Sequence, residues 1–258
     1  MILTLTDTET IRSAQILPGF ISVDHGSISE NPPAPSGYEC HARVQGVSRV
    51  LLMIKIKICG ITNLEDALAA ADAGADALGF NFYKKSPRCI EPDKAAEIIE
   101  QLPPFIVPVG VFVNEREDRI REIQARTLIQ VVQLHGDESP DFCQRFGGRV
   151  IKAFQVKDKE SIKHLAHYHV GALLLDSYRD GVRGGTGVTF DWHLAVVAKT
   201  FGKVILAGGL TPENVAEAVK LVQPYGVDVA GGVERDKGVK DHAMVRKFIV
   251  EVRRASRP

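Results

Sequence analysis

The stretch that decides the fold is residues 54–63, which read Ile54-Lys55-Ile56-Lys57-Ile58-Cys59-Gly60-Ile61-Thr62-Asn63. Alternation of apolar and basic residues predicts a β-strand, with Lys55, Lys57 and Cys59 on one face and the isoleucines on the other. A helical pattern follows almost at once, so Cys59 ends a strand, where α/β proteins build their active sites. Neighbouring lysines favour the thiolate of a cysteine. The alternative is a small buried thiol without a chemical role.

Seven more short apolar runs follow along the chain and are typical of parallel strands buried on both faces. Together with residues 54–58, the predicted strands cover 77–82, 106–112, 129–134, 150–154, 172–175, 203–206 and 227–230. Helical patterns lie between them, for example at 64–73 and 92–100, and a last helix is predicted at about 243–252. Ser139-Pro140-Asp141 and Thr211-Pro212-Glu213 each place a cap residue before a proline, which predicts a helix start at each.

Eight strand–helix units in about 200 residues predict an α/β protein of the (βα)₈ TIM-barrel class. The alternative is a doubly wound open sheet, which normally has fewer strands and a glycine fingerprint after the first of them; that fingerprint is absent here.

Residues 1–52 differ from this regular pattern. The segment 27–37 is rich in proline, serine and glycine and favours neither a helix nor a central strand. We therefore expect a flexible extension at 1–52 and a barrel domain at 53–258, and Met53 is a candidate for the natural start of the protein.

Composition limits the classes of function. The 258 residues carry a formal net charge of +0, with 25% charged and 45% hydrophobic residues, as in ordinary globular proteins. This balance gives no electrostatic argument for a nucleic-acid or membrane partner. The four cysteines (Cys40, Cys59, Cys89 and Cys143) lie far apart and lack metal-site spacing. Without a secretory signal pattern, we expect a reduced, cytoplasmic protein with no bound metal.

In a barrel, the carboxyl ends of all strands meet at one mouth, and two glycine pairs follow the last two strands. Gly208-Gly209 and Gly231-Gly232 predict a phosphate site, because glycine lets an anion approach bare backbone N–H groups. The alternative is that each pair simply ends a strand.

Other side chains at the mouth have less specific signals. Burial of Asp176 after an apolar strand would disfavour its charged form and suit a general acid; alternatively, it pairs with Lys57 or another barrel lysine. Arg88 suits a substrate carboxylate but is also typical of a solvated loop. His135 either orients a substrate or caps its strand. The glycine-rich segment 180–187 is either a lid or a passive loop.

These segments in this order resemble the phosphoribosylanthranilate isomerase family of tryptophan biosynthesis, over essentially all of residues 53–258. The motifs that carry the resemblance are Lys57-Ile58-Cys59-Gly60-Ile61-Thr62, Gly79-Phe80 with Ser86-Pro87-Arg88, Val109-Gly110-Val111-Phe112-Val113-Asn114, Gln133-Leu134-His135-Gly136, Leu175-Asp176-Ser177, Gly184-Gly185-Thr186-Gly187 and Ala207-Gly208-Gly209-Leu210. Each motif is weak alone, but their order and spacing are specific.

The resemblance implies an Amadori rearrangement of N-(5-phosphoribosyl)anthranilate without metal or cofactor, by a monomer or a homodimer. It implies that Asp176 is the general acid, that Cys59 is the general base, and that Arg88 binds the anthranilate carboxylate. Gln133, His135 and Asp228 are further candidate substrate-binding residues. The implied phosphate site is the backbone around Gly208, Gly209, Gly231 and Gly232, and the implied lid is Gly184, Gly185, Thr186 and Gly187.

The chain departs from the family pattern after the eighth strand. The family often has Asp-Val-Ser-Ser-Gly-Val-Glu, whereas this chain has Asp228-Val229-Ala230-Gly231-Gly232-Val233-Glu234 and therefore lacks the hydroxyl donors. We expect a weaker grip on phosphate.

Competing interpretations are a histidine-pathway sugar isomerase, a ribulose-phosphate epimerase and a barrel that binds a phosphorylated ligand without catalysis. Paired aspartates are typical of the first and metal ligands of the second, so Cys59 together with Asp176 favours the isomerase.

Overall fold

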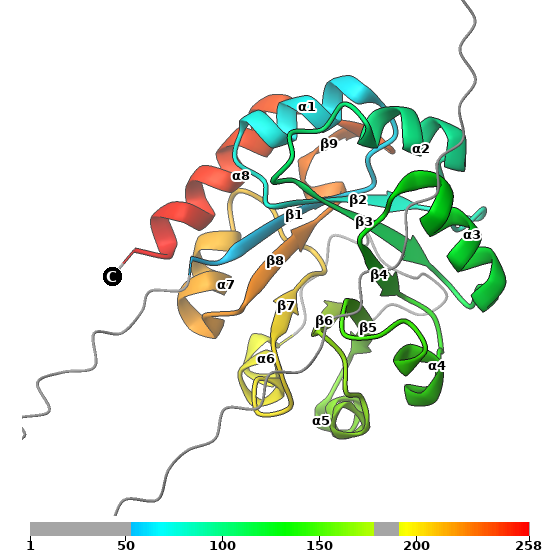
Figure 1. Cartoon of the computed structure of the whole chain (residues 1–258). Helices are drawn as coiled ribbons and strands as arrows, with labels where there is room; N and C mark the ends of the chain where they lie inside the picture. Colours follow the sequence, from blue (N-terminus) through cyan, green and yellow to red (C-terminus); the bar gives the residue numbers. More distant parts are fainter. Residues whose placement is uncertain (1–52, 178–190, 258) are drawn as a thin grey trace, which may run out of the picture. The chain divides into compact units, whose positions relative to one another are not determined.

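The computed structural model describes residues 53–177 and 191–257, and in them eight parallel strands close into a barrel (Figure 1). Pairing of β1 with β8, with Lys57 opposite Asp228, completes the ring. The predicted (βα)₈ architecture is thus confirmed. The strands are β1 (Lys55–Cys59), β2 (Ala77–Asn81), β3 (Val107–Phe112), β4 (Val131–Leu134), β5 (Val150–Val156), β6 (Ala172–Ser177), β7 (Val204–Leu206) and β8 (Gly226–Val229).

Helices surround the barrel and connect consecutive strands (Figure 1). They are α1 (Leu64–Asp72), α2 (Pro92–Ile99), α3 (Glu117–Thr127), α4 (Pro140–Gln144), α5 (Lys159–Lys163), α6 (Trp192–Ala198), α7 (Val215–Val222) and α8 (His242–Ala255). Two short 3₁₀ helices, η1 (His164–His167) and η2 (Gly231–Val233), lie after α5 and β8.

One of the two predicted helix starts is correct. The Ser139 side chain accepts a hydrogen bond from Phe142 N and caps α4. At the other, Thr211 accepts from Glu213 N in a turn, and α7 begins only at Val215. Asn214 explains the delay, because its side chain donates to Gly209 O and accepts from Thr211 N. This turn holds the loop after β7 against its own glycine pair.

The core has two parts, as expected for strands that are buried on both faces. A small cluster fills the barrel, and a larger layer lies between the strands and the helices. In β1, Ile56 and Ile58 are fully buried in the outer layer, so Lys57 and Cys59 face the interior, as the alternation predicts. Lys55 is exposed at the amino end of the strand and pairs with Asp76.

An element that the sequence analysis does not predict lies between β8 and α8. Strands β9 (Glu234–Asp236) and β10 (Val239–Lys240) form a small antiparallel hairpin. Gly238 makes its turn with a φ of 82°, a conformation that favours glycine. The hairpin brings Glu234 and Lys240 to the mouth of the barrel.

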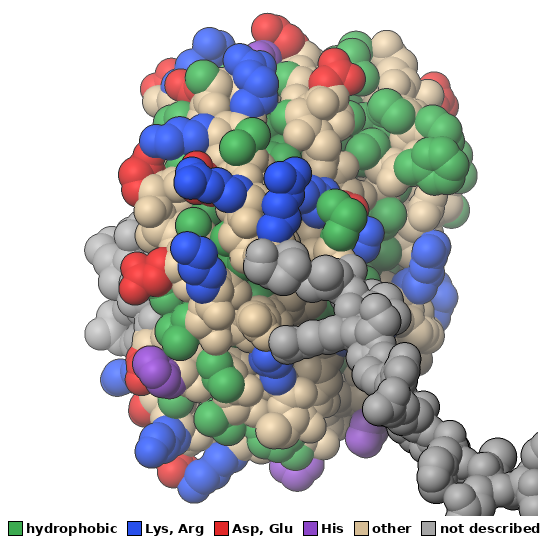
Figure 2. All heavy atoms as spheres, turned by 90° about the vertical axis from the view of Figure 1, so that its left-hand side faces the viewer, with side chains coloured by type: hydrophobic (Ala, Val, Ile, Leu, Met, Phe, Trp, Pro, Cys, Tyr) green, Lys and Arg blue, Asp and Glu red, His purple; other side chains and the backbone are tan. Residues whose placement is uncertain are grey.

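The surface carries charges of both signs. On the face drawn in Figure 2, basic and acidic side chains are interspersed with apolar ones. No helix within residues 53–177 and 191–257 is long and apolar enough to cross a bilayer. Residues 1–52 lie outside the described part, so the extension proposed for them stays a prediction.

Candidate active site

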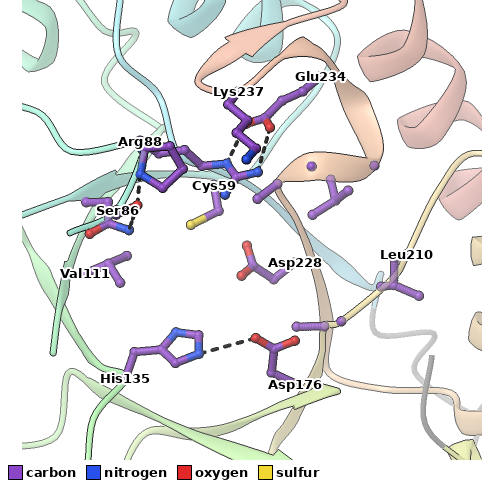
Figure 3. Close-up of a pocket in the computed structure, with 18 of the residues that line it drawn as sticks. Cys59, Ser86, Arg88, Val111, His135, Asp176, Leu210, Asp228, Glu234 and Lys237 are labelled. Atoms are coloured by element: carbon purple, nitrogen blue, oxygen red, sulfur yellow. Dashed lines mark hydrogen bonds and ion pairs between the residues drawn. The ribbon is translucent and has the colours of Figure 1, made fainter. Parts of the chain in front are cut away.

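A cavity of about 970 Å³ opens at the carboxyl end of the barrel (Figure 3). It brings together ten predicted site residues from six strand ends: Cys59, Arg88, Gln133, His135, Asp176, Gly208, Gly209, Asp228, Gly231 and Gly232. The four predicted lid residues, Gly184, Gly185, Thr186 and Gly187, lie outside the described residues. Within the described ranges, no three His, Cys, Asp or Glu side chains are grouped as metal ligands.

Cys59 ends β1 with its thiol over Gly79 of β2. A methyl group at Gly79 would lie 2.7 Å from Cys59 Sγ and 3.1 Å from Lys57 Cε, so glycine makes room for both side chains. Burial raises the pKa of the Cys59 thiol, and the nearby Lys57 lowers it only in part. The expectation that neighbouring lysines make a thiolate is therefore not supported, because desolvation by burial outweighs the effect of Lys57 on the pKa.

Lys57 is committed to a different partner. Its Nζ lies 2.8 Å from Asp228 Oδ1, and both side chains are more than 90% buried. Burial works against the ammonium, but the charges of Asp228 and Cys59 outweigh it and raise the pKa of Lys57. The alternative pairing of Asp176 with Lys57 is therefore wrong.

Asp176 faces His135 across the floor of the cavity. The His135 Nε2 atom lies 3.3 Å from Asp176 Oδ2, an ion-pair distance without hydrogen-bond alignment. The Gln133 amide nitrogen lies 3.1 Å from His135 Nδ1. An amide donor there makes Nδ1 the acceptor and places the ring hydrogen on Nε2, toward Asp176. Gln133 Oε1 is buried with no hydrogen-bond partner among the described residues.

Arg88 reaches the cavity from the loop after β2 and is held by a carboxylate of the protein itself. Its Nε and Nη2 donate to the two carboxylate oxygens of Glu234, each at 2.7 Å. Glu234 raises the pKa of Arg88. Gly60 gives the Arg88 stem its room, since a methyl group there would lie 2.5 Å from Arg88 Cδ. The predicted carboxylate-binding fork therefore has one edge occupied.

Lys240 lies beneath this pair and is fully buried. Its Nζ donates to Cys59 O at 2.6 Å, to Glu234 Oε1 at 2.8 Å and to Ala230 O at 3.2 Å. Burial lowers the pKa of Lys240, although Glu234 partly opposes this. The Lys240 ammonium thus links the end of β1, the loop after β8 and Glu234, the partner of Arg88.

The two glycine pairs line the cavity in the loops after β7 and β8. Gly208 and Gly209 have φ values of 77° and 66°, and a side chain on Gly208 would collide with Ser177 and Asp176. A side chain on Gly232 would collide with Leu210 O. Among described residues, the N–H groups of Gly208, Gly209, Gly231 and Gly232 donate to no backbone or side-chain acceptor. These amides are thus free for an anion.

The residues that the sequence analysis missed are Gly79, Glu234 and Lys240. A glycine inside a strand signals close approach of another group, so Gly79 carried a readable signal. Glu234 stands in the family pattern, but its pairing with Arg88 joins residues 146 positions apart. Lys240 lies in a polar segment without a clear alternation of apolar and polar residues. The neighbouring sequence therefore does not predict that Lys240 is buried.

Comparison with known proteins agrees with this geometry. The sequence model of the family described as N-(5'-phosphoribosyl)anthranilate (PRA) isomerase matches residues 56–251. The enzyme of that name from Geotalea uraniireducens is 59% identical over 197 residues, covering 76% of this chain and 97% of its own. The one from Geobacter sulfurreducens is 57% identical, with the same coverage of both chains.

Solved structures give the same result. The phosphoribosyl anthranilate isomerase of Thermotoga maritima superposes with a TM-score of 0.72 at 41% identity, over 78% of this chain and 98% of its own. Another structure of such an enzyme, in complex with reduced 1-(o-carboxyphenylamino)-1-deoxyribulose 5-phosphate, superposes with a TM-score of 0.69 at 40% identity over the same shares. The chain therefore belongs to the phosphoribosylanthranilate isomerase family of tryptophan biosynthesis.

Proposed function

We propose that this chain converts N-(5-phosphoribosyl)anthranilate to 1-(o-carboxyphenylamino)-1-deoxyribulose 5-phosphate by general acid–base catalysis in this cavity. The observation that carries the proposal is the placement of a carboxyl group, Asp176, and a thiol, Cys59, on opposite sides of one cavity (Figure 3). An aldose–ketose rearrangement needs one group that gives a proton and one that takes a proton.

Asp176 opens the ring. Its carboxyl group gives a proton to the furanose oxygen, the bond from that oxygen to C1 breaks, and the anilino nitrogen supplies the electron pair for a protonated Schiff base. Ser177 N donates a hydrogen bond to Asp176 Oδ1, and His135, which Gln133 contacts, lies within ion-pair distance of the other carboxyl oxygen. The expectation that Asp176 keeps its proton until substrate binds remains a prediction.

Cys59 completes the rearrangement. Its thiolate takes the proton from C2, and the electron pair of that C–H bond moves toward the iminium carbon to give an enolamine. Loss of the hydroxyl proton at C2 and protonation at C1 then give the ketone. Because burial raises the pKa of the free Cys59 thiol, Lys57 assists by stabilising the thiolate when it forms.

Two anion sites orient the substrate. Arg88 binds the anthranilate carboxylate through the donors that Glu234 leaves free, and the amides of the two glycine pairs bind the phosphate. Gln133 and Asp228 face the sugar between these sites. The segment with Gly184, Gly185, Thr186 and Gly187 is the proposed lid.

The reaction needs no metal or organic cofactor in this scheme. The chain works as a monomer or a homodimer, and one relative is described as a dimeric enzyme from which monomers were made. Sedimentation of the purified protein distinguishes the two states. A cytoplasmic location remains a prediction.

The activity test is loss of the fluorescence of phosphoribosylanthranilate on addition of the purified chain, with complementation of a strain that lacks this step. A protein that begins at Met53 should rescue growth on medium without tryptophan, because the whole described barrel lies after that residue. Absence of turnover in vitro together with retained binding of the reduced product would favour the non-catalytic barrel instead.

Gly231→Ser is expected to lower KM about threefold, since it restores a hydroxyl donor that the family often has near the phosphate. Gly231 is not among the described residues with positive φ, so serine fits its backbone. KM from initial rates measures the effect.

The matched control is Gly232→Ser, which adds the same group one residue later. There a side chain would collide with Leu210 O, so we expect a higher KM and a lower melting temperature. An unchanged or higher KM in Gly231→Ser would contradict the account of the missing donors.

A further inference from the structure

Two of the cations near the cavity cannot contact a ligand. Lys57 is buried against Asp228, as described above. Lys240 has no exposed side-chain surface and gives its donors to Glu234, Cys59 O and Ala230 O. Both ammonium groups therefore bind acceptors of the protein itself.

Arg88 is only partly available. Glu234 holds its Nε and one Nη2 hydrogen, so the outer edge of the guanidinium, formed by Nη1 and the second Nη2 hydrogen, faces the cavity. Glu234 lies 2.7 Å from Arg88 and 2.8 Å from the buried Lys240, so these three groups together present one net positive charge to a ligand. A carboxylate at this edge would gain from a second cation.

Three exposed cations line the cavity without a hydrogen bond or ion pair to any described residue: Lys85, Arg235 and Lys237. Lys237 stands in the turn of the β9–β10 hairpin, next to Gly238. This turn is anchored, because Thr62 Oγ1 donates to Gly238 O at 2.6 Å. A methyl group on Gly238 would lie 3.3 Å from Pro87 O, so the turn packs against the segment that carries Arg88.

Figure 3 draws Lys237 on the same side of the cavity as Arg88 and Glu234. Asp176 and His135 lie on the other side of Cys59 and Asp228, and Leu210, in the loop after β7, lies away from Arg88. Gly208 and Gly209 directly precede Leu210 in the loop after β7, whereas Gly231 and Gly232 share the segment after β8 with Lys237, so binding of inorganic phosphate is measured separately below.

We propose that Lys237 is a further substrate-binding residue, whose ammonium joins the outer edge of Arg88 in holding the carboxylate of the anthranilate ring. The proposal rests on the proposed function, which supplies the ligand. Arg88 gives this carboxylate a fixed direction, and Lys237 adds a second, exposed positive charge on the same side of the cavity. The hairpin therefore contributes to the choice of substrate as well as to the fold.

Lys237→Gln is expected to raise KM about three- to fivefold, which is the size of the effect when one exposed charge pair is lost. We expect little change in kcat, because the lost contact stabilises the bound substrate and the transition state equally. Lys237→Arg should restore the parent KM. The control is Lys94→Gln, which removes an exposed charge from the outer helix α2, away from the cavity, and should leave KM unchanged.

A ligand pair separates a carboxylate contact from a general effect of charge. The probes are the reduced product, its analogue without the ring carboxyl, and inorganic phosphate, each measured by calorimetric titration. Lys237→Gln should weaken binding of the carboxylated compound about three- to fivefold and leave the other two unchanged. Equal loss for both organic compounds, or weaker binding of phosphate, would overturn the proposal.

Lys85→Gln and Arg235→Gln test whether any positive charge at the mouth suffices. If either variant weakens binding of the carboxylated compound as much as Lys237→Gln does, the proposal of a specific contact with Lys237 is wrong. Failure of the proposed function is distinct, because it would appear as a parent chain without turnover, whereas the titrations do not depend on turnover. A parent that binds neither organic compound overturns both proposals.

Discussion

Asp176→Asn is expected to lower kcat by at least about 100-fold, since an amide cannot give the ring oxygen a proton and general acid catalysis is worth about 10²- to 10⁴-fold. The substitution keeps the shape of the side chain, and the asparagine oxygen can still accept from Ser177 N, as Asp176 Oδ1 does at 2.8 Å. Binding of the reduced product should therefore change little. Steady-state kinetics and a calorimetric titration measure the two effects separately.

A matched control is Asp141→Asn in α4, an exposed carboxylate in the first turn of a helix on the outside of the barrel. It changes the same chemical group and should keep the parent kcat. Thermal unfolding of both variants shows whether the barrel is intact. If Asp176→Asn keeps more than a tenth of the parent kcat and folds normally, another group protonates the substrate.

The barrel could be predicted from the sequence because its signals are local. The strands span three to seven residues and most of them are apolar runs, whereas β1 shows an alternation that places Lys57 and Cys59 inside, as observed. Element ends were less predictable. The predicted start of α7 is wrong because the Asn214 side chain forms hydrogen bonds with Gly209 and Thr211. These bonds depend on the conformation of the loop after β7, which the sequence does not give.

The sequence predicts which residues form the site but not which of them form ion pairs and hydrogen bonds with one another. Once the barrel is given, strand ends must meet, which places Cys59, Asp176 and the glycine pairs at one mouth. Which charge pairs with which depends on distances across the barrel. Lys57 therefore pairs with Asp228 and not with Asp176, although either was compatible with the sequence.

The same limit explains the error about the thiol. A sequence places Lys57 beside Cys59, but it gives neither the depth of burial nor the position of Asp228, and both of these raise the pKa of Cys59. An electrostatic effect that depends on three groups and on exclusion of water cannot be inferred from the one neighbour that strand parity supplies.

Cys59→Ser is expected to lower kcat/KM by at least about 100-fold, because a serine hydroxyl does not ionise near neutral pH and leaves C2 without a base. Serine is nearly isosteric, so it should fit over Gly79 and keep the fold. Cys89→Ser, in the loop after Arg88, changes the same group on a second half-buried cysteine and should keep the parent activity. Activity of Cys59→Ser within tenfold of the parent would remove Cys59 from the mechanism.

The ionisation of Cys59 can be measured without turnover, by the rate of its alkylation with iodoacetamide against pH. Since burial raises the thiol pKa above its ordinary value of 9.0, the rate should still be rising at pH 9, with Cys59→Ser as the background for the other cysteines. Asp228→Asn should speed the reaction at pH 8, because the negative charge of Asp228 opposes the thiolate while Lys57 favours it. A plateau below pH 8 in the parent would mean that Lys57 outweighs burial, and that the thiolate is present before substrate binds.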